Sequence, residues 1–397
     1  MSDNLSACLQ SAQAVLADTV TGPGLPNACY TDDDMHAYQD EALFATTWAA
    51  LGFGKDVPNP GDVYPVEFLG QPLFIARDKA GTVRVFHNIC SHRGMILVSE
   101  PGNTKGLLRC PYHSWCFDLN GALKRTPYVG GHDKDDCAGF DPANHGLKGV
   151  RAHIQFDTVF VNLSGDAPTF EDVHATFLAR WHEFADRPLF HGGTHSTMNF
   201  ELHGNWKLAI ENYCEAYHLP WIHPGLNSYS RLEDHYNILE PGLFSGQGTT
   251  VYNPDLIPDS GRTFPSLDDI SSMWDTGAEY IALYPNVLFG VHRDHFFTIL
   301  VTPDGPHKTL ERVELYYYDE ACTGADHEDL RKANCETWRS VFLEDVFVVE
   351  GMQKGRASSG FNGGVLTPVQ DPPTRLFHRW AADRLLQHHN RASMAAE

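Results

Sequence analysis

The sequence predicts an α+β protein, with a small all-β domain followed by a larger domain that mixes helices and strands. Between residues 46 and 163, short strand-like segments alternate with turn signals such as those at 79–81 and 120–121. The segment 164–168 (Ser-Gly-Asp-Ala-Pro) interrupts this pattern, and helical periods mix with strands beyond it. We therefore expect an all-β domain over residues 45–163 and an α+β domain over residues 164–397.

Each expected element follows from its residue period. Strand-like runs occur at 63–68, 72–77, 83–89, 107–109 and 159–163, and again at 280–289, 296–301 and 312–318. Helical periods occur at 171–185, 206–219 and 326–353. Residues 1–44 read as a helical segment with a break at 22–26, and we expect this segment to pack on the second domain.

Composition limits the class of protein. The chain has 397 residues and 42% hydrophobic content, which is enough for two packed domains. Its 29 basic and 51 acidic side chains give a net charge of −22. Such a surface repels phosphate, so we expect neither nucleic acid nor an anionic membrane as a partner.

The N-terminal residues and the cysteines predict a cytoplasmic protein. The first twenty or so residues lack the basic region of a signal peptide, and no apolar run is long enough to span a bilayer. The nine cysteines are scattered along the chain. An odd number in a long chain without an export signal argues against a disulfide framework.

The first group of chemically active residues consists of two Cys–His pairs. Cys90 and His92 follow one strand-like segment, and Cys110 and His113 follow another. Two thiolates and two imidazoles suit either zinc or an iron–sulfur cluster. Zinc sites usually pair Cys with Cys at close range, whereas each loop here offers one Cys and one His. In a Rieske centre one iron takes two Cys and the other takes two His, so the arrangement favours a [2Fe–2S] cluster.

The second group contains two histidines and an acid. In residues 206–218 a helical period puts Glu211, Glu215 and His218 on one face. Pro220 is expected to end this helix, which lets His223 swing back towards His218.

A carboxylate near the C-terminus completes the second group. On the helix expected over 326–353, Asp345 lies in an otherwise apolar stripe of Trp338, Phe342, Val349 and Met352. A buried Asp is costly unless it meets a cation. Two His and one carboxylate form the facial triad of non-haem iron oxygenases, so we predict His218, His223 and Asp345 as iron ligands. Glu344, on a neighbouring stripe, is the alternative to Asp345.

The sequence around both groups of residues resembles the α-subunit family of Rieske oxygenases. The motifs are Asn-Ile-Cys-Ser-His-Arg-Gly over 88–94, Cys-Pro-Tyr-His-Ser-Trp over 110–115, and the segment 205–218, and the resemblance spans about residues 45–360. Ser114 stands where Gly is common in the family, a departure from which we expect no functional consequence. The resemblance implies a Rieske domain followed by a catalytic domain with an antiparallel sheet under helices.

The resemblance also implies partners and a mechanism. It implies a homotrimer in which one subunit's cluster lies beside its neighbour's mononuclear Fe(II), and a separate flavin reductase that supplies electrons from NAD(P)H. Glu215 occupies the position of the acid that bridges the two centres. Because Glu215 lies one helical turn before His218, we expect the two side chains to meet; the alternative is a surface acid that pairs with Lys207 or water.

The resemblance gives the substrate as a class only. Glu at the bridging position is similar to the branch that oxidises carnitine, glycine betaine and stachydrine, whereas ring-hydroxylating dioxygenases usually carry Asp. The expected function is therefore O2-dependent monooxygenation, by hydroxylation or N-demethylation, of a small betaine or other quaternary ammonium compound, or of an N-methyl amino acid. An aromatic-ring-hydroxylating dioxygenase is the alternative; an electron carrier without catalysis and a zinc-stabilised binding module are more remote.

A quaternary ammonium pocket should present aromatic faces to the cation. The sequence offers four candidates in the expected strands, although aromatic strand residues are often plain core: Tyr280, Tyr284, Phe296 and Phe297. Arg293 either holds a substrate carboxylate or pairs with Asp294.

Overall fold

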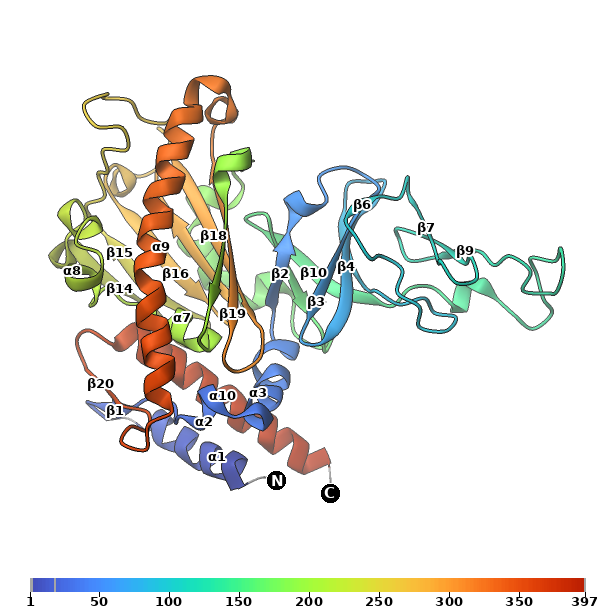
Figure 1. Cartoon of the computed structure of the whole chain (residues 1–397), viewed down its shortest axis with the longest axis horizontal. Coiled ribbons are helices and arrows are strands. Elements are labelled where there is room, and N and C mark those ends of the chain that lie inside the picture. Colours follow the sequence, from blue (N-terminus) through green and yellow to red (C-terminus); the bar gives the residue numbers. More distant parts are fainter. Residues whose placement is uncertain (1–2, 18, 396–397) are drawn as a thin grey trace. The chain divides into compact units, whose positions relative to one another are not determined.

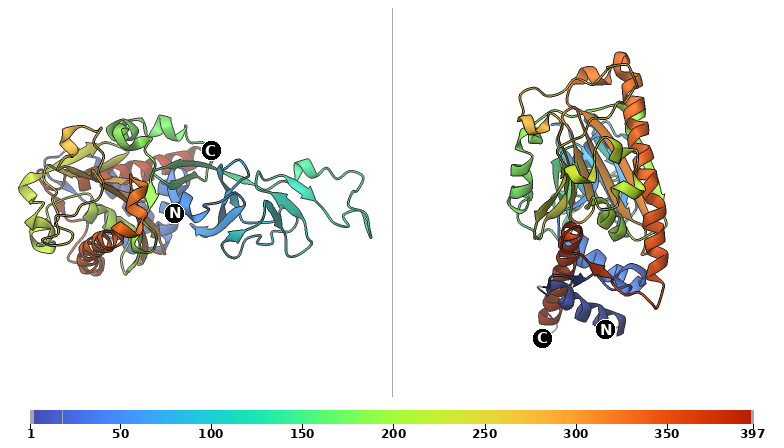
Figure 2. Two further views of the ribbon diagram at one scale, coloured as in Figure 1. Left: turned by 90° about the horizontal axis from the view of Figure 1, so that it is seen from above. Right: turned by 90° about the vertical axis from the view of Figure 1, so that its left-hand side faces the viewer.

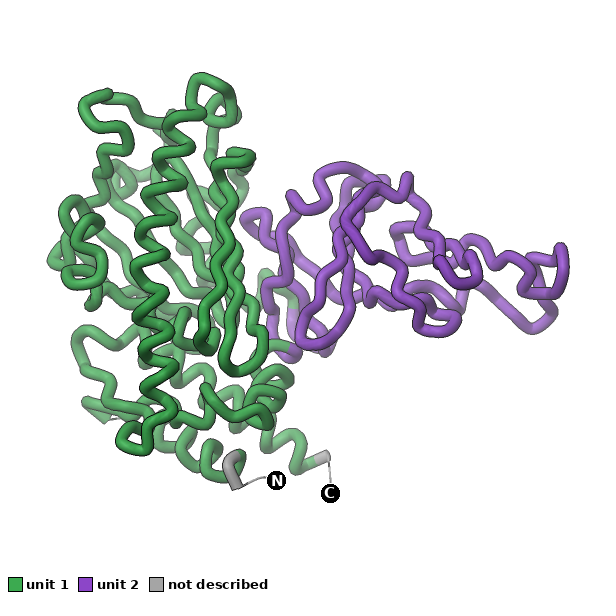
Figure 3. Tube along the Cα trace, in the orientation of Figure 1, with its two compact units in different colours: residues 1–44, 169–397 green, residues 45–168 purple. Residues whose placement is uncertain are grey.

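The computed structural model describes residues 3–17 and 19–395 and divides the chain into two compact units. Residues 45–168 form one unit, and the segments before and after it form the other (Figure 3). The first unit is all-β, and the second combines one large antiparallel sheet with helices, so the predicted α+β class is confirmed.

The unit of residues 45–168 is built from two antiparallel sheets (Figure 1). The larger sheet has seven strands in the order β2-β11-β10-β5-β4-β3-β6, and the smaller has the order β7-β8-β9. The predicted strands are present, and the turns at 79–81 and 120–121 join β4 to β5 and β8 to β9, as predicted. The bounds are β2 Ala49–Phe53, β3 Asp62–Phe68, β4 Gln71–Arg77, β5 Val83–His87, β6 Gly102–Asn103, β7 Leu107–Arg109, β8 Cys116–Asp118, β9 Leu123–Arg125, β10 Gly149–Gln155 and β11 Thr158–Asn162.

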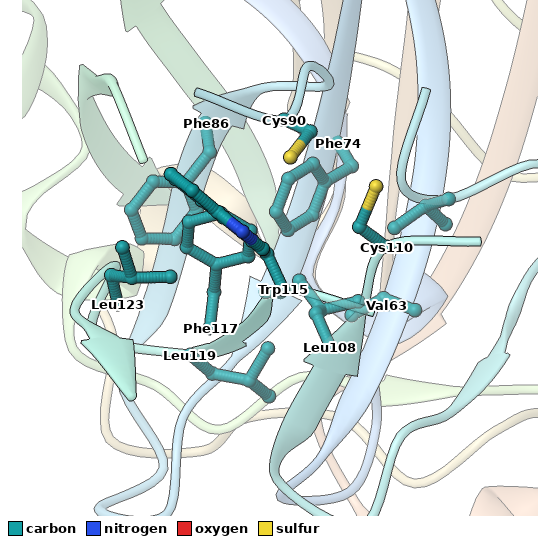
Figure 4. Packing of buried hydrophobic residues seen from close by; sticks show 12 residues of the cluster. Val63, Phe74, Phe86, Cys90, Leu108, Cys110, Trp115, Phe117, Leu119 and Leu123 are labelled. Carbon is teal, nitrogen blue, oxygen red and sulfur yellow. The ribbon is translucent and has the colours of Figure 1, made fainter. Parts of the chain in front are cut away.

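One apolar core joins the two sheets of this unit. Phe74 and Phe86 of the larger sheet pack against Trp115, Phe117 and other residues of the smaller sheet and its loops (Figure 4). Cys90 and Cys110 belong to the same core, and both are almost inaccessible to solvent. The core therefore fixes the two loops that carry the Cys–His pairs.

The other unit contains an eight-stranded antiparallel sheet. Seven strands follow the order β12-β19-β18-β17-β16-β15-β14, and β13 pairs with β19 beside β12. The strand bounds are β12 Phe190–His191, β13 Thr197–Leu202, β14 His235–Glu240, β15 Phe244–Thr249, β16 Ala278–Leu283, β17 Val287–Val291, β18 His295–Pro303 and β19 Thr309–Tyr317. The central strands are buried along their length, which predicts that helices cover both faces.

Helices cover the two faces of this sheet (Figure 2). Residues of α5 (Ala175–Arg180) and the adjoining Trp181 pack on one face, against Phe289 and Phe296. The long helix α9 (Glu328–Arg356) and α7 (Trp206–Tyr213) lie on the other face. In the described part of the chain, no helix is both long and apolar enough to cross a membrane.

The N-terminal segment and the C-terminal helix pack together and against α7. The helix α1 (Asp3–Leu16) contacts α10 (Pro372–Ala395), and the short strand β1 (Gly22–Pro23) pairs with β20 (Val365–Leu366). Two further helices, α2 (Ala28–Thr31) and α3 (Asp33–Gln39), complete the segment. Sequence reasoning did not predict α10, which carries few apolar residues outside its buried face.

A buried ion-pair network fixes α7 to these neighbours. Glu211 of α7 lies 3.0 Å from His378 of α10 and 3.6 Å from Arg356 of α9, and it accepts a 2.5 Å hydrogen bond from Tyr30 of α2. Although burial opposes the shift, His378 and Arg356 lower the pKa of Glu211, so the carboxylate stays charged. The position of α7 is thus set from three sides.

Two element predictions need correction. The helix predicted over 206–219 ends at Tyr213, and a short helix α8 (Leu219–Ile222) follows a turn. Pro220 lies in the first turn of α8, where its missing N–H costs nothing, so it does not end the first helix as predicted. The single strand predicted over 280–289 is two strands, β16 and β17, which pair as a hairpin.

Candidate cluster and metal sites

The two Cys–His loops of the all-β unit have the same backbone turn. The Cys90 N–H donates to the Met95 carbonyl, and the Cys110 N–H donates to the Trp115 carbonyl, both at 2.8 Å. Four residues after each Cys, the N–H of Gly94 or Ser114 donates back to the carbonyl of that Cys. Two equivalent turns therefore offer one thiol and one imidazole each.

The side chains of these loops converge. The thiols of Cys90 and Cys110 lie near each other in the core (Figure 4), and the rings of His92 and His113 have centroids 4.7 Å apart. The Nδ1 atom of His113 is buried and has no hydrogen-bond partner among the described residues. Two buried thiols, two adjacent imidazoles and an orphaned ring nitrogen fit a metal cluster with mixed Cys and His ligands.

Ser114 occupies a backbone position that favours glycine. Its φ is 63°, close to the 72° of Gly94 in the equivalent turn. The conformation is costly for a residue with a Cβ, but Arg109 donates a 2.9 Å hydrogen bond to the Ser114 hydroxyl. The departure from glycine is therefore accommodated locally, next to His113.

In the other unit, His218, His223 and Asp345 meet at one point. The Nε2 atoms of the two histidines are 3.2 Å apart, and Asp345 Oδ1 lies 3.0 Å from His223 Nε2 and 3.7 Å from His218 Nε2. No other group of three or more His, Cys, Asp or Glu ligand atoms in residues 3–17 and 19–395 is arranged closely enough to hold one ion. Two imidazoles and one carboxylate form a donor set that would suit Fe(II).

Outer acids fix the orientation of both histidines. Glu215 Oε1 lies 2.6 Å from Nδ1 of His218, and Glu344 Oε2 lies 2.7 Å from Nδ1 of His223. Each acid thus holds the ring nitrogen that points away from Asp345. Asp345 and Glu344 raise the pKa of His223 against the opposing effect of burial. Asp345 itself accepts a 3.3 Å hydrogen bond from Asn212.

The chain brings Glu215 to His218 without a helix between them. The α-helix ends at Tyr213, and the Glu215 side chain accepts a hydrogen bond from the backbone N–H of Tyr217 in the turn that follows. Lys207 is fully buried, with its ammonium 5.0 Å from the Tyr30 ring centroid and 4.8 Å from that of Trp206. The alternative pairing of Glu215 with Lys207 was therefore wrong.

The triad opens into a cavity with an aromatic wall. Phe297 and Trp338 have ring centroids 4.6 Å apart, and Phe342 stacks on Trp338 at 5.6 Å. Tyr280 lies 6.3 Å from Phe297, and its hydroxyl is 3.1 Å from His292 Nε2. We call this set the aromatic wall; its members are Tyr213, Tyr280, Phe297, Trp338 and Phe342.

The strand register explains part of this wall. Tyr280 pairs with Gly290, and Gly290 pairs with Phe297, so the three residues share one face of the sheet. A Cβ on Gly290 would lie 2.3 Å from the Phe297 ring, so only glycine leaves room for the ring between the strands.

Some of the pocket candidates from the sequence are wrong. Tyr280 and Phe297 line the cavity, but Phe296 points to the opposite face because side chains alternate along β18. Tyr284 packs on Phe377 and Trp380 of α10. Arg293 lines a different cavity and pairs there with Asp275, not with Asp294.

Sequence reasoning missed several lining residues. Trp338 and Phe342 were visible as neighbours of Asp345 in the apolar stripe, but nothing in the sequence showed that they face the site. The polar lining residues Ser230, His235 and Gln247 carried no sequence signal, because they come from strands and loops that the pattern did not reveal.

Family comparisons cover both units. The Rieske [2Fe-2S] domain matches residues 47–135, and the family described as ring hydroxylating alpha subunit (catalytic domain) matches residues 180–387, more than half of the chain. The chain belongs to this family of Rieske-type oxygenases. It is therefore an oxidoreductase, and the two matches imply a Rieske cluster in the first domain and a mononuclear iron in the second.

Individual relatives within the Rieske oxygenases are distant but similar over most of their length. The carnitine monooxygenase oxygenase subunit of Acinetobacter pittii is 28% identical over 345 residues, which cover 85% of this chain and 86% of that protein. The chloroplastic choline monooxygenase of Arabidopsis thaliana is 26% identical over 374 residues, which cover 92% of this chain and 82% of that protein.

Solved structures share the fold. The quaternary ammonium Rieske monooxygenase CntA gives a TM-score of 0.75 at 24% identity, covering 94% of this chain and 98% of that one. Naphthalene 1,2-dioxygenase from Rhodococcus gives 0.76 at 19% identity, covering 97% of this chain and 99% of that one. The fold is therefore that of the Rieske oxygenases, and it does not distinguish the two substrate classes.

Proposed function

We propose that this Rieske oxygenase is a monooxygenase that hydroxylates or N-demethylates a small quaternary ammonium or N-methyl compound. The observation that carries the proposal is the aromatic wall beside a triad whose histidines are held by two further acids. Iron held by the triad would supply the O2-dependent oxidation, and the protein would bind and orient the substrate. Because the substrate is inferred from the lining of the cavity, the test compares the oxidation of a charged compound with that of its neutral analogue.

We assign the cluster to residues 45–168, with Cys90, His92, Cys110 and His113 as its ligands. The convergent side chains and the orphaned Nδ1 of His113 support this assignment. We assign the mononuclear iron to the unit of residues 1–44 and 169–397, with His218, His223 and Asp345 as ligands. Asp345 is preferred to Glu344 because it alone lies on the Nε2 side of both histidines.

Glu215 is proposed as the residue that connects His218 to a cluster histidine of a neighbouring subunit in a homotrimer. It is partly accessible, and exposed aromatic residues flank it: Tyr217 is 43% and Trp221 is 68% exposed. In the cluster domain Tyr112 and Tyr128 are similarly exposed near the histidines. A second copy of the chain would cover such apolar surface. The electrons would come from NAD(P)H through a separate flavin-containing reductase.

The electrostatics of the site favour a cationic substrate. Glu215, Glu344 and Asp345 together carry one more negative charge than a ferrous ion carries positive. No lysine or arginine of the described chain lines the cavity. An ammonium group would therefore meet a negative field and aromatic faces, each of which contributes roughly 0.5–2 kcal/mol of cation–π attraction.

Substrate charge tests this function directly. With a surrogate reductase, choline should be oxidised with a kcat/KM about 10- to 100-fold higher than that of 3,3-dimethylbutan-1-ol, in which carbon replaces the charged nitrogen. Trp338→Leu should lower kcat/KM for choline more than it lowers kcat/KM for the neutral compound. Equal oxidation of the two compounds, or dihydroxylation of naphthalene in their place, would contradict the proposal and favour the aromatic dioxygenase.

The cluster assignment predicts a loss of colour. Cys110→Ser should bleach the visible absorption of the Rieske cluster and abolish NAD(P)H-driven turnover, because serine does not replace the thiolate on iron. Cys116→Ser is the matched control, since Cys116 is a nearby buried thiol that donates to the Ser114 carbonyl and is not assigned to the cluster. A normal Rieske spectrum in Cys110→Ser would show that the assignment is wrong.

A further inference from the structure

The triad cavity has a polar side as well as the aromatic wall. Ser230, His235 and Gln247 line it, and they form one hydrogen-bonded group. The Ser230 hydroxyl lies 3.0 Å from His235 Nε2, and His235 Nδ1 donates to the Gln247 side-chain carbonyl. The Gln247 amide nitrogen is left to donate, at 3.5 Å, only to the Glu215 carbonyl within the described chain. We call these three residues the polar side.

The polar side adjoins the aromatic wall in a fixed register. Gln247 pairs with Tyr280 across neighbouring strands, and the row continues through Gly290 to Phe297. Directly paired residues share a face, and neighbouring strands lie about 4.8 Å apart. An amide donor thus stands one strand away from the aromatic rings. A substrate two or three bonds long could place its ammonium group on the rings and an oxygen on the amide.

This polar side contains no cation. His235 has both ring nitrogens engaged, and burial lowers its pKa, so it remains neutral at neutral pH. The described residues that line the cavity include neither lysine nor arginine, and Arg293 is paired with Asp275 in a different cavity. A substrate carboxylate would lose its hydration here without gaining an ion pair, and Asp345, which lines the same cavity, would repel it. A hydroxyl or other neutral oxygen has no such penalty.

We propose that the enzyme selects ammonium compounds whose other end is a neutral oxygen, such as amino alcohols of the choline type, over betaines that end in a carboxylate. Gln247 and Ser230 are the specificity-determining residues, and His235 positions Gln247. This inference rests on the proposed function, because it assumes that the aromatic wall receives an ammonium group.

Choline and glycine betaine form a matched pair for the test, since both carry a trimethylammonium group and differ at the oxygen end. In the holoenzyme with a surrogate reductase, kcat/KM for choline should exceed that for glycine betaine about 10-fold or more, the effect of roughly 1.4 kcal/mol. Calorimetric titration of the resting holoenzyme, without reductase, should give the same order of Kd values.

Two substitutions test the role of Gln247. Gln247→Lys places a cation on the polar side and should lower the choline-to-betaine ratio about 10-fold or more by improving betaine binding. Gln247→Leu, which adds no charge, should weaken choline about 10-fold and leave betaine nearly unchanged. Asn237→Leu is the control: Asn237 pairs with Gln247 in the same row but is exposed and donates to Val369 outside the cavity.

These experiments distinguish selectivity for the neutral oxygen end from ammonium oxidation itself. Faster oxidation of glycine betaine by the parent enzyme, or an unchanged ratio in both Gln247 variants, would overturn the inference and leave an ammonium monooxygenase. Oxidation of naphthalene without oxidation of either ammonium compound would overturn both. A variant whose catalytic unit fails to fold is recognised by loss of the mononuclear iron, and the ratio in the remaining variant and the parent then decides.

Discussion

Asp345→Ala is expected to empty the mononuclear iron site and abolish substrate oxidation while the cluster spectrum stays normal. Asp345 supplies the only carboxylate oxygen near both His Nε2 atoms in the described chain. Without it, two imidazoles remain to hold Fe(II), which is too few for a stable site. The cluster domain is a separate compact unit and should be unaffected. Iron and acid-labile sulfide counts per chain, with the visible spectrum, measure both effects.

Glu344 provides the matched comparison, because it is adjacent in sequence and touches the same histidine on its other nitrogen. Glu344→Gln keeps a hydrogen-bonding group there, and we expect iron affinity to fall about 10- to 100-fold, the usual effect of changing an outer acid. If Glu344→Gln emptied the site and Asp345→Ala retained iron, the two acids would have to exchange roles.

Glu215→Gln is expected to slow electron delivery to the mononuclear site about 10- to 100-fold, with the cluster retained and the mononuclear iron still bound when iron is supplied in excess. Glu215 holds His218 Nδ1 at 2.6 Å and is partly accessible, which fits the proposed contact with a cluster histidine of a neighbouring subunit. Glutamine preserves size and removes the charge. The measurement is a single-turnover experiment in which the cluster is reduced first and oxidation of the cluster is followed after mixing with substrate and O2.

Glu215→Asp separates placement from chemistry. The shorter side chain keeps the charge but cannot reach both partners, so an intermediate rate is expected. A Glu215→Gln variant with parent kinetics and full metal content would remove the bridging role, and with it one reason for preferring an ammonium substrate.

The proposed cluster ligands could be chosen from the sequence because they are local. Each Cys–His pair lies within four residues, in a turn that two backbone hydrogen bonds fix, so the motif already contains the geometry. The strands that lead into these turns were also predictable from alternation and from the glycines at 81 and 121, which adopt positive φ.

The three residues of the proposed iron triad could be chosen from the sequence, but their local structure could not be predicted. The sequence placed Glu215 beside His218 by assuming a continuous helix, whereas the contact forms across a turn that Glu215 itself stabilises. Side-chain capture of a backbone N–H competes with helix formation, and helical period does not report it. The choice of Asp345 over Glu344 needed the positions of both ring nitrogens of His223.

The lining of the cavity could not be predicted because it depends on which sheet face each strand presents. Phe296 and Phe297 are adjacent and equally apolar, and only the register of β18 shows that Phe297 faces the iron site. His235 lies in strand β14 and Gln247 in strand β15, and the sequence pattern predicted neither strand. These polar residues determine the proposed choice of substrate, so the sequence alone left that choice open.

A single turnover without reductase shows whether this enzyme oxidises an ammonium substrate at the proposed iron site. Protein with its cluster and iron pre-reduced is mixed with O2 and choline, and the oxidised ammonium product is quantified against the mononuclear iron. We expect nearly one equivalent of oxidised choline per mononuclear iron from the parent protein, and none from Asp345→Ala. Absence of ammonium oxidation by fully loaded protein, with naphthalene converted to a dihydrodiol under the same conditions, would contradict it.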